Sequence, residues 1–177
     1  MFLAIKEMKF AKLRYSLIIG IMFLISFVVF LLSGLANGLA TEFSEVIDRW
    51  DAGRIVLSEE SNGVLVASQL TIDDLSEVKT SEKAPLALYS GSVEIAGEKE
   101  NLSFFGTQPE AFFLPELTEG KSFNEKNEVI ISQALADAGL AIGDTITIGS
   151  QGVEVIVTGI FPKTSYVVTP VMYGSIE

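Results

Sequence analysis

The chain begins with a long apolar run and then changes to short stretches in which apolar and polar residues alternate. No charged residue occurs from Ser16 to Ala36, a run of 21 positions. Because about 20 apolar residues in a helix cross the hydrocarbon core of a bilayer, the pattern predicts a transmembrane helix over residues 15–40. A cleaved signal peptide is the alternative, since Gly38 and Ala40 resemble a cleavage site. Its apolar region is usually about 7–15 residues, shorter than this run.

The charges on either side of this run differ in sign. Basic residues precede it, and acidic residues follow it; they are Lys6, Lys9, Lys12 and Arg14 before, and Glu42, Glu45 and Asp48 after. The positive-inside rule then predicts a cytoplasmic N-terminus, with the rest of the chain outside the cell membrane. Residues 1–14 also alternate between apolar and basic positions, which predicts a basic amphipathic segment on the inner membrane surface.

One face of the predicted membrane helix carries small and polar side chains. Steps of three and four residues place these positions together: Met22, Ser26, Phe30, Ser33 and Asn37, with Gly34 beside them. Small and hydroxyl residues suit close packing between helices in lipid, so the face predicts a packing surface or a cargo path within the membrane. The alternative is that lipid tolerates these residues, since Ser can bond to its own backbone.

Beyond the membrane helix, the pattern predicts a helical stalk over residues 41–52 and a domain over residues 53–177. Two strand-like runs, residues 54–59 and 64–69, lie on either side of the Asn62-Gly63 turn signal. Thr71 and Asp74 have the spacing of a capping box, which predicts a short helix. Residues 92–107 read as a hairpin that turns between Gly97 and Glu100.

The last third of the chain is the most regular. The pattern predicts a strand over residues 127–132, a short helix that Ser132 caps and Gly139 ends, a hairpin over residues 144–161 and a final strand over residues 166–173. The aromatic cluster of Phe104, Phe105, Phe112 and Phe113 is predicted to lie in the core. The mixture of hairpins and short helices indicates an α+β fold.

The amino-acid composition excludes several kinds of catalytic, metal-binding and nucleic-acid-binding site. The chain has no Cys and no His, which excludes disulfides, thiolate metal sites and Ser-His-Asp catalysis. Its net charge of -11 excludes nucleic-acid binding. No complete phosphate-binding loop of the pattern Gly-x4-Gly-Lys-Ser/Thr occurs, and the many carboxylates read as a solvated surface. We therefore predict no catalytic residue and no metal site.

The motifs in the last third resemble a known family. The stretch from Asn127 to Tyr166, "NEVIISQALADAGLAIGDTITIGSQGVEVIVTGIFPKTSY", contains Gly139-Leu140, then Gly143 to Ile146, then Val157 to Ile160 in the family's order. It is similar to the extracytoplasmic core of MacB/FtsX-type ABC transporter permeases. The N-terminal "SGLANGLA" and "IDRWDA" segments resemble the haem-exporter (HrtB-like) subset.

The resemblance implies a permease subunit of an ABC exporter that works as a homodimer. ATP would be used by a separate cytoplasmic ABC ATPase, and this chain would bind no cofactor of its own. Haem is the hydrophobic cargo that the subset implies, with Met22, Glu42 and Glu45 as candidate ligands. Because the family's outer domain usually continues before three further helices, the domain over residues 53–177 is expected to be incomplete. A membrane-tethered binding, sensor or regulatory domain without transport activity is the alternative.

Overall fold

The computed structural model describes residues 11–95, 97–149 and 152–176, except the side chains of residues 42–45. Residues 1–10, which hold most of the predicted basic amphipathic segment, lie outside the described part. The chain divides into two compact units, Met1–Thr41 and Glu42–Glu177. We describe each unit by itself.

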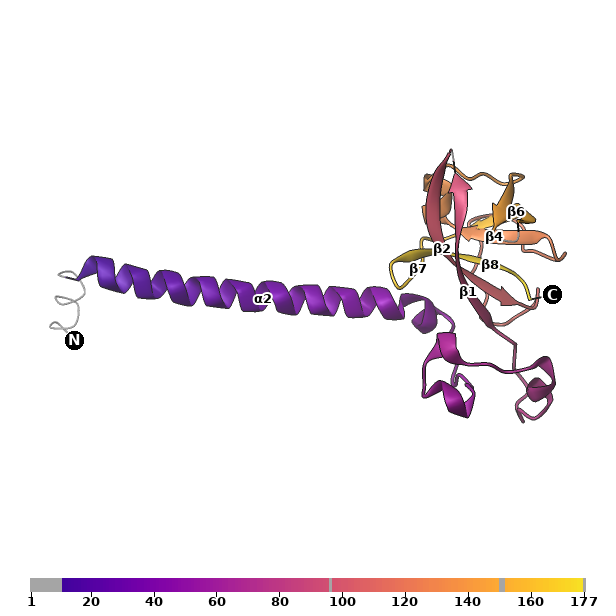
Figure 1. Ribbon diagram of the computed structural model, residues 1–177, viewed down its shortest axis with the longest axis horizontal. Coiled ribbons are helices and arrows are strands. Elements are labelled where there is room, and N and C mark those ends of the chain that lie inside the picture. Colours follow the sequence, from indigo (N-terminus) through magenta and orange to yellow (C-terminus); the bar gives the residue numbers. More distant parts are fainter. Residues whose placement is uncertain (1–10, 96, 150–151, 177) are drawn as a thin grey trace. The chain divides into compact units, whose positions relative to one another are not determined.

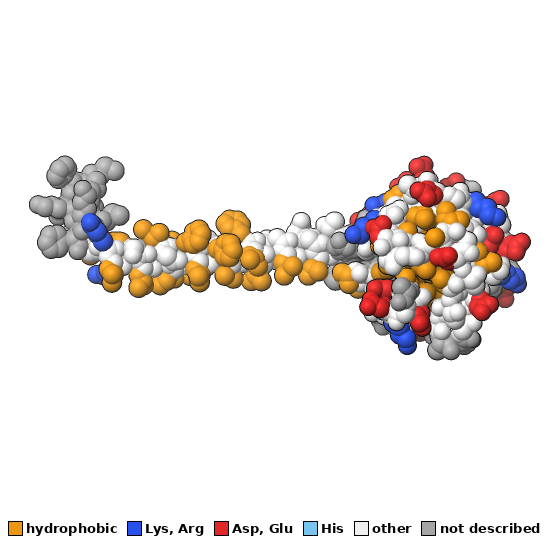
Figure 2. All heavy atoms as spheres, turned by 90° about the horizontal axis from the view of Figure 1, so that it is seen from above, with side chains coloured by type: hydrophobic (Ala, Val, Ile, Leu, Met, Phe, Trp, Pro, Cys, Tyr) orange, Lys and Arg blue, Asp and Glu red, His pale blue; other side chains and the backbone are white. Residues whose placement is uncertain are grey.

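The described part of the first unit is an apolar helix. Helix α2 runs over Lys12–Arg49, and its part from Lys12 to Thr41 is long and apolar enough to cross a membrane, with a mean hydropathy of 2.8. Its large apolar side chains are exposed within the chain, and Figure 2 shows hydrophobic side chains along its length. Apolar side chains around a whole helix are typical of a helix surrounded by lipid or by other helices.

The last turns of α2 belong to the second unit. The predicted stalk is helical as far as Arg49, but Val46 and Trp50 are buried in the core of this unit rather than exposed to solvent. The indole Nε1 of Trp50 donates a hydrogen bond of 2.9 Å to the hydroxyl of Tyr173. The helix ends where Asp51 adopts a left-handed backbone, with a φ of 47°.

The segment after the helix forms 3-10 turns. They are η1 at Glu59–Ser61, η2 at Leu65–Ala67 and η3 at Ile72–Ser76, so the prediction of strands at residues 54–59 and 64–69 was wrong. Backbone groups here are bound by hydroxyls instead of by a partner strand: Ser58 N donates to Ser68 Oγ at 2.9 Å. The capping box was predicted correctly, since Thr71 N donates to Asp74 Oδ2 at 2.7 Å.

The strands of the second unit form a sheet that closes on itself (Figure 1). Around the ring, each strand pairs with the next in the order β2, β1, β5, β6, β4, β8, and β8 pairs again with β2. Their bounds are β1 Ala87–Ile95, β2 Glu98–Thr107, β4 Glu128–Ser132, β5 Thr145–Ile148, β6 Val153–Phe161 and β8 Thr169–Ser175. Two short strands are added, β3 at Glu119–Gly120 on β6 and β7 at Ser165–Tyr166 on β8.

Alternate residues of these strands belong to two hydrophobic clusters. One contains Val93, Leu102 and Val157 and is joined by Leu135 of the short helix α3, Gln133–Asp137. The other is aromatic and joins the helix end to the sheet; its largest members are Trp50, Phe105, Phe113, Phe123, Phe161 and Tyr173. The α+β class and the predicted hairpins are confirmed, and Phe105 and Phe113 lie in the core, although Phe112 is half exposed.

Three local details differ from the prediction. Strand β2 already begins at Glu98, so the β1–β2 turn is shorter than expected. Ser132 precedes α3 as predicted, but its buried hydroxyl makes no capping hydrogen bond and has no partner in the described part of the chain. The expected final strand is interrupted, because Val167 and Val168 have φ values of 48° and 64° and turn β7 back onto β8.

Candidate functional site

The predicted packing face of the membrane helix is open within this chain. The face residues lie in α2, where Met22 and Phe30 are 65 % and 77 % exposed and the polar positions Ser26, Ser33, Gly34 and Asn37 are exposed as well. A Cβ added at Gly34 would meet no other atom within 4 Å. The face is therefore free to pack against another helix, and its role stays a prediction.

The structure describes the side chain of one of the three candidate cargo ligands. The Met22 thioether lies on the exposed face of α2. Glu42 and Glu45 also belong to α2, but their side chains lie outside the described part. Their assignment as cargo ligands stays a prediction.

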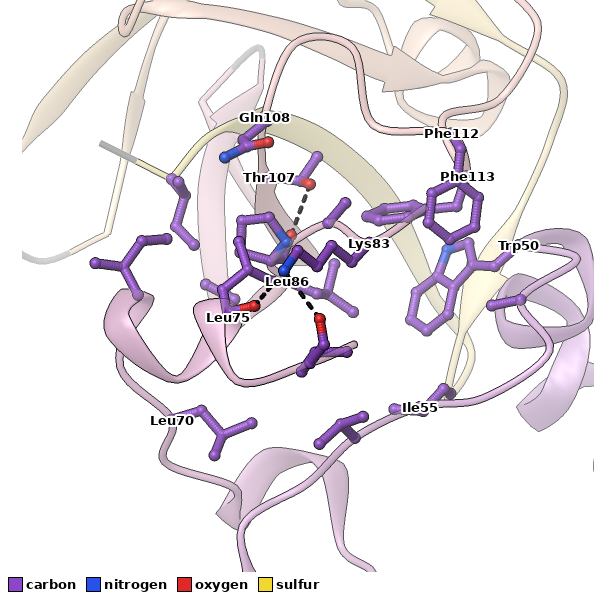
Figure 3. Close-up of a pocket in the computed structure, with 18 of the residues that line it drawn as sticks. Trp50, Ile55, Leu70, Leu75, Lys83, Leu86, Thr107, Gln108, Phe112 and Phe113 are labelled. Atoms are coloured by element: carbon purple, nitrogen blue, oxygen red, sulfur yellow. Dashed lines mark hydrogen bonds between the residues drawn. The ribbon is translucent and has the colours of Figure 1, made fainter. Parts of the chain in front are cut away.

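The second unit contains a large groove that sequence reasoning missed. It lies between the segment that follows α2 and the wall that carries Trp50, Phe112 and Phe113, and its volume is about 2350 Å³ (Figure 3). Ile55 and Leu70 line the opposite side. Small-molecule sites usually measure about 300–1,000 Å³, so the groove has room for a larger apolar partner. No sequence signal marks it, because apolar runs look the same whether they line a groove or a core.

Hydrogen bonds hold two polar side chains that line this groove, Lys83 and Thr107. The Lys83 ammonium donates to the carbonyl oxygens of Leu75 and Val78 at 2.7 and 2.9 Å, which holds the end of the η3 turn. The Thr107 hydroxyl donates to the carbonyl of Pro85 at 2.7 Å and ties the segment to the sheet. Lys83 therefore has a structural role here, because it holds the turn that forms one side of the groove.

The two carboxyl groups with lowered pKa values, those of Asp74 and Glu128, also accept hydrogen bonds within turns. Hydrogen bonds from Thr71 lower the pKa of Asp74. The pKa of Glu128 is lowered mainly by the backbone N–H of Asn124, and Lys121 lies 3.5 Å from Glu128 as an ion partner. Among the described residues, no cluster of three His, Cys, Asp or Glu side chains is arranged to hold a metal ion.

A Gly-Lys-Ser triplet at residues 120–122 also needs a structural explanation. It lacks the first glycine of a phosphate-binding loop, because Pro115 stands at that position. Gly120 lies in β3, with a φ of 81°, and an added Cβ would clash with the carbonyl of Thr158 on β6. The glycine is explained by this close strand contact.

Comparison with known proteins identifies the fold. The family model of the MacB-like periplasmic core domain matches residues 16–176. The chain belongs to this family. The MacB-like core is also similar to solved structures: the periplasmic region of MacB from Actinobacillus actinomycetemcomitans, and the extracellular domain of the noncanonic ABC-type transporter YknZ from Gram-positive bacteria. Both have a TM-score of 0.51, at 16 % and 18 % identity. The matches cover 67 % and 68 % of this chain, and 60 % and 69 % of those chains.

Curated relatives match over most of the chain as well. A "Putative hemin transport system permease protein HrtB" from Staphylococcus haemolyticus is 28 % identical over 93 % of this chain and 46 % of its own length. The protein of the same name from Staphylococcus epidermidis is 29 % identical, over 93 % and 47 %. An uncharacterized ABC transporter permease from Mycobacterium tuberculosis is 26 % identical, over 93 % and 47 %. The MacB-like core and its helix therefore span about half the length of these relatives, and the resemblance to MacB-type permeases with HrtB-like relatives is confirmed.

Proposed function

We propose that this chain is the N-terminal part of a permease subunit of an ABC exporter in the cell membrane. The observation that carries the proposal is the match to permeases over 93 % of the chain, the apolar helix included. In this proposal α2 crosses the membrane with its N-terminus in the cytoplasm, and residues 42–177 lie outside. The asymmetry of charge around the span supports that orientation.

The energy source in this proposal is a separate cytoplasmic ATPase. Both the absence of a complete phosphate-binding loop from the sequence and the structural explanation of Gly120 support this division of labour. Motion driven by ATP would reach the outer unit through α2, because the end of the helix is buried in that unit at Val46 and Trp50. A second copy of the permease would pack against the open face of α2.

The proposed cargo is haem, which the names of the HrtB relatives support. Met22 is the ligand candidate that the structure describes, and a thioether can bind haem iron. We expect haemin added to the whole chain in nanodiscs to give a shifted Soret band, and Met22→Leu to weaken binding about tenfold, equivalent to about 1.4 kcal/mol.

The control moves the thioether without changing the composition. Leu24 lies on the opposite face of the helix, so the double variant Met22→Leu/Leu24→Met should bind as weakly as Met22→Leu. Equal Soret shifts in all three proteins would exclude Met22 as a ligand. Copurification with a co-expressed ABC ATPase from the same source tests the permease role separately, and failure to form that complex would contradict it.

The second candidate is a membrane-tethered binding domain that works without an ATPase. The groove favours this function, because about 2350 Å³ beside Trp50, Phe112 and Phe113 is room for an apolar partner. A chain that forms no ATPase complex, but loses a bound partner when Phe112 is changed to Ser, would establish this function instead.

A further inference from the structure

The turn between β7 and β8 has an unusual sequence for its conformation. Tyr166 pairs with Thr169, so Val167 and Val168 form a two-residue connection in which both φ values are positive, 48° and 64°. Such turns favour Asn-Gly, and β-branched residues are the least suited to a left-handed backbone. The local sequence therefore opposes the conformation that the turn adopts.

The side chains of the two valines lie largely outside the packed part of the unit. The two valines are 46 % and 61 % exposed, so much of their apolar surface faces outward at the tip of the hairpin. Strained backbone positions are often found at functional sites, such as those that hold a ligand. The tip thus presents two apolar side chains in a conformation that costs the isolated domain stability.

The stretch of sequence that contains the tip differs in charge from the rest of the chain. No Asp or Glu lies between Glu154 and Glu177, although the chain carries 23 acidic residues. The charged residue in this stretch is Lys163, which is exposed. An apolar tip whose sequence neighbours include a lysine and no carboxylate suits the interfacial region of a bilayer, because a Lys side chain can extend to the headgroups while the apolar residues are buried.

Aromatic contacts within the second unit connect the hairpin to Trp50, the residue after α2. The Tyr166 ring lies 5.4 Å from that of Phe105, in an edge-to-face contact, and Phe105 lies 5.4 Å from Trp50. Trp50 directly follows α2, whose apolar part ends at Thr41. The root of the hairpin is therefore packed, within its own unit, on the residues that follow the membrane span in the sequence.

We propose that the Val167–Val168 tip inserts into the lipid surface on the outer side of the membrane. The proposal rests on the membrane setting of the proposed function. In this proposal the outer unit makes a second membrane contact besides α2, through the β7–β8 hairpin. The contact explains why the turn carries two apolar residues despite their strained backbone. The occupant is lipid, recognised by apolar burial of the valines with Lys163 at the headgroup level.

The test uses single nitroxide labels, because the chain has no native Cys to remove. Val168→Cys carries the label at the tip. Val153→Cys is the matched control, since Val153 is also an exposed valine, at 55 %, on another part of the sheet. Leu24→Cys reports on the membrane helix. The whole chain is placed in nanodiscs of phosphatidylcholine and phosphatidylglycerol, and oxygen and a water-soluble nickel complex compete to relax each label.

We expect the label at residue 168 to be relaxed more by oxygen than by nickel, as at residue 24, while residue 153 shows the aqueous pattern. An aqueous pattern at 168 with a lipid pattern at 24 would overturn the inference alone. An aqueous pattern at both would overturn the membrane setting as well. Protection of 168 from both reagents would indicate a protein contact and would also overturn the lipid assignment.

Discussion

At the residue scale, the burial of Tyr173 makes stability depend on pH. Burial raises the pKa of Tyr173 to about 12, from a usual value of 10.0. The folded unit therefore holds this proton at a pH where the unfolded chain has lost it. The stabilisation is complete below pH 10 and is lost as pH rises through about 12. A shift of this size corresponds to about 2–3 kcal/mol of unfolding free energy. Urea unfolding of the chain, followed by the fluorescence of its single Trp, measures it.

The variant Tyr173→Phe isolates this contribution. At neutral pH we expect the free energy of unfolding to fall by about 1–3 kcal/mol, because the buried Trp50 N–H loses its acceptor. Between pH 10 and 12 the variant should lose less stability than the parent chain. An unchanged decline over that range would show that other groups cause it.

At the element scale, the β7–β8 turn provides a prediction about stability. Replacing Val167 and Val168 with Asn and Gly supplies the residues that a turn with two positive φ values favours. We expect the free energy of unfolding to rise by about 1–3 kcal/mol, since a left-handed backbone costs about 1–2 kcal/mol per ordinary residue. Thermal unfolding of the whole chain in detergent measures the gain. The Ala-Ala variant keeps the unfavourable backbone and should show a much smaller gain; equal gains would contradict the explanation.

The elements that the sequence predicted correctly have local signals. Gly139 ends α3 with a φ of 119°, and the β-branched run of β5 and β6 forms the expected hairpin. The segment after α2 contains short apolar runs like those of a strand, and such a run alone cannot show whether a partner strand is free to pair with it. Six strands of this sheet pair with one another in a ring, while hydroxyls such as Ser58 and Ser68 bind the backbone of the segment outside it.

At the scale of the whole molecule, the sequence predicted the parts of the site that depend on composition. The apolar span and its polar face follow from residue type and helical period alone. The groove and the burial of Trp50 depend on which distant segments meet, such as the pairing of Trp50 with Tyr173 across 123 positions. A pattern of residues along the chain does not show which distant segments come into contact. The unusual Val167–Val168 turn was missed for a related reason, because these residues favour a strand locally.

The open face of α2 gives a prediction for the assembled molecule. An atom added at Gly34 meets nothing within 4 Å in this chain, so Gly34→Leu should leave the single chain unaffected. If the face packs against a second copy, the added bulk should weaken association in bilayers about tenfold, or by about 1–2 kcal/mol, as for close helix pairs. Energy transfer between labelled chains in liposomes at several lipid dilutions measures it. Val28→Leu adds bulk on the opposite face and should leave association unchanged. Equal effects of the two substitutions would show that the small-residue face is not the packing surface.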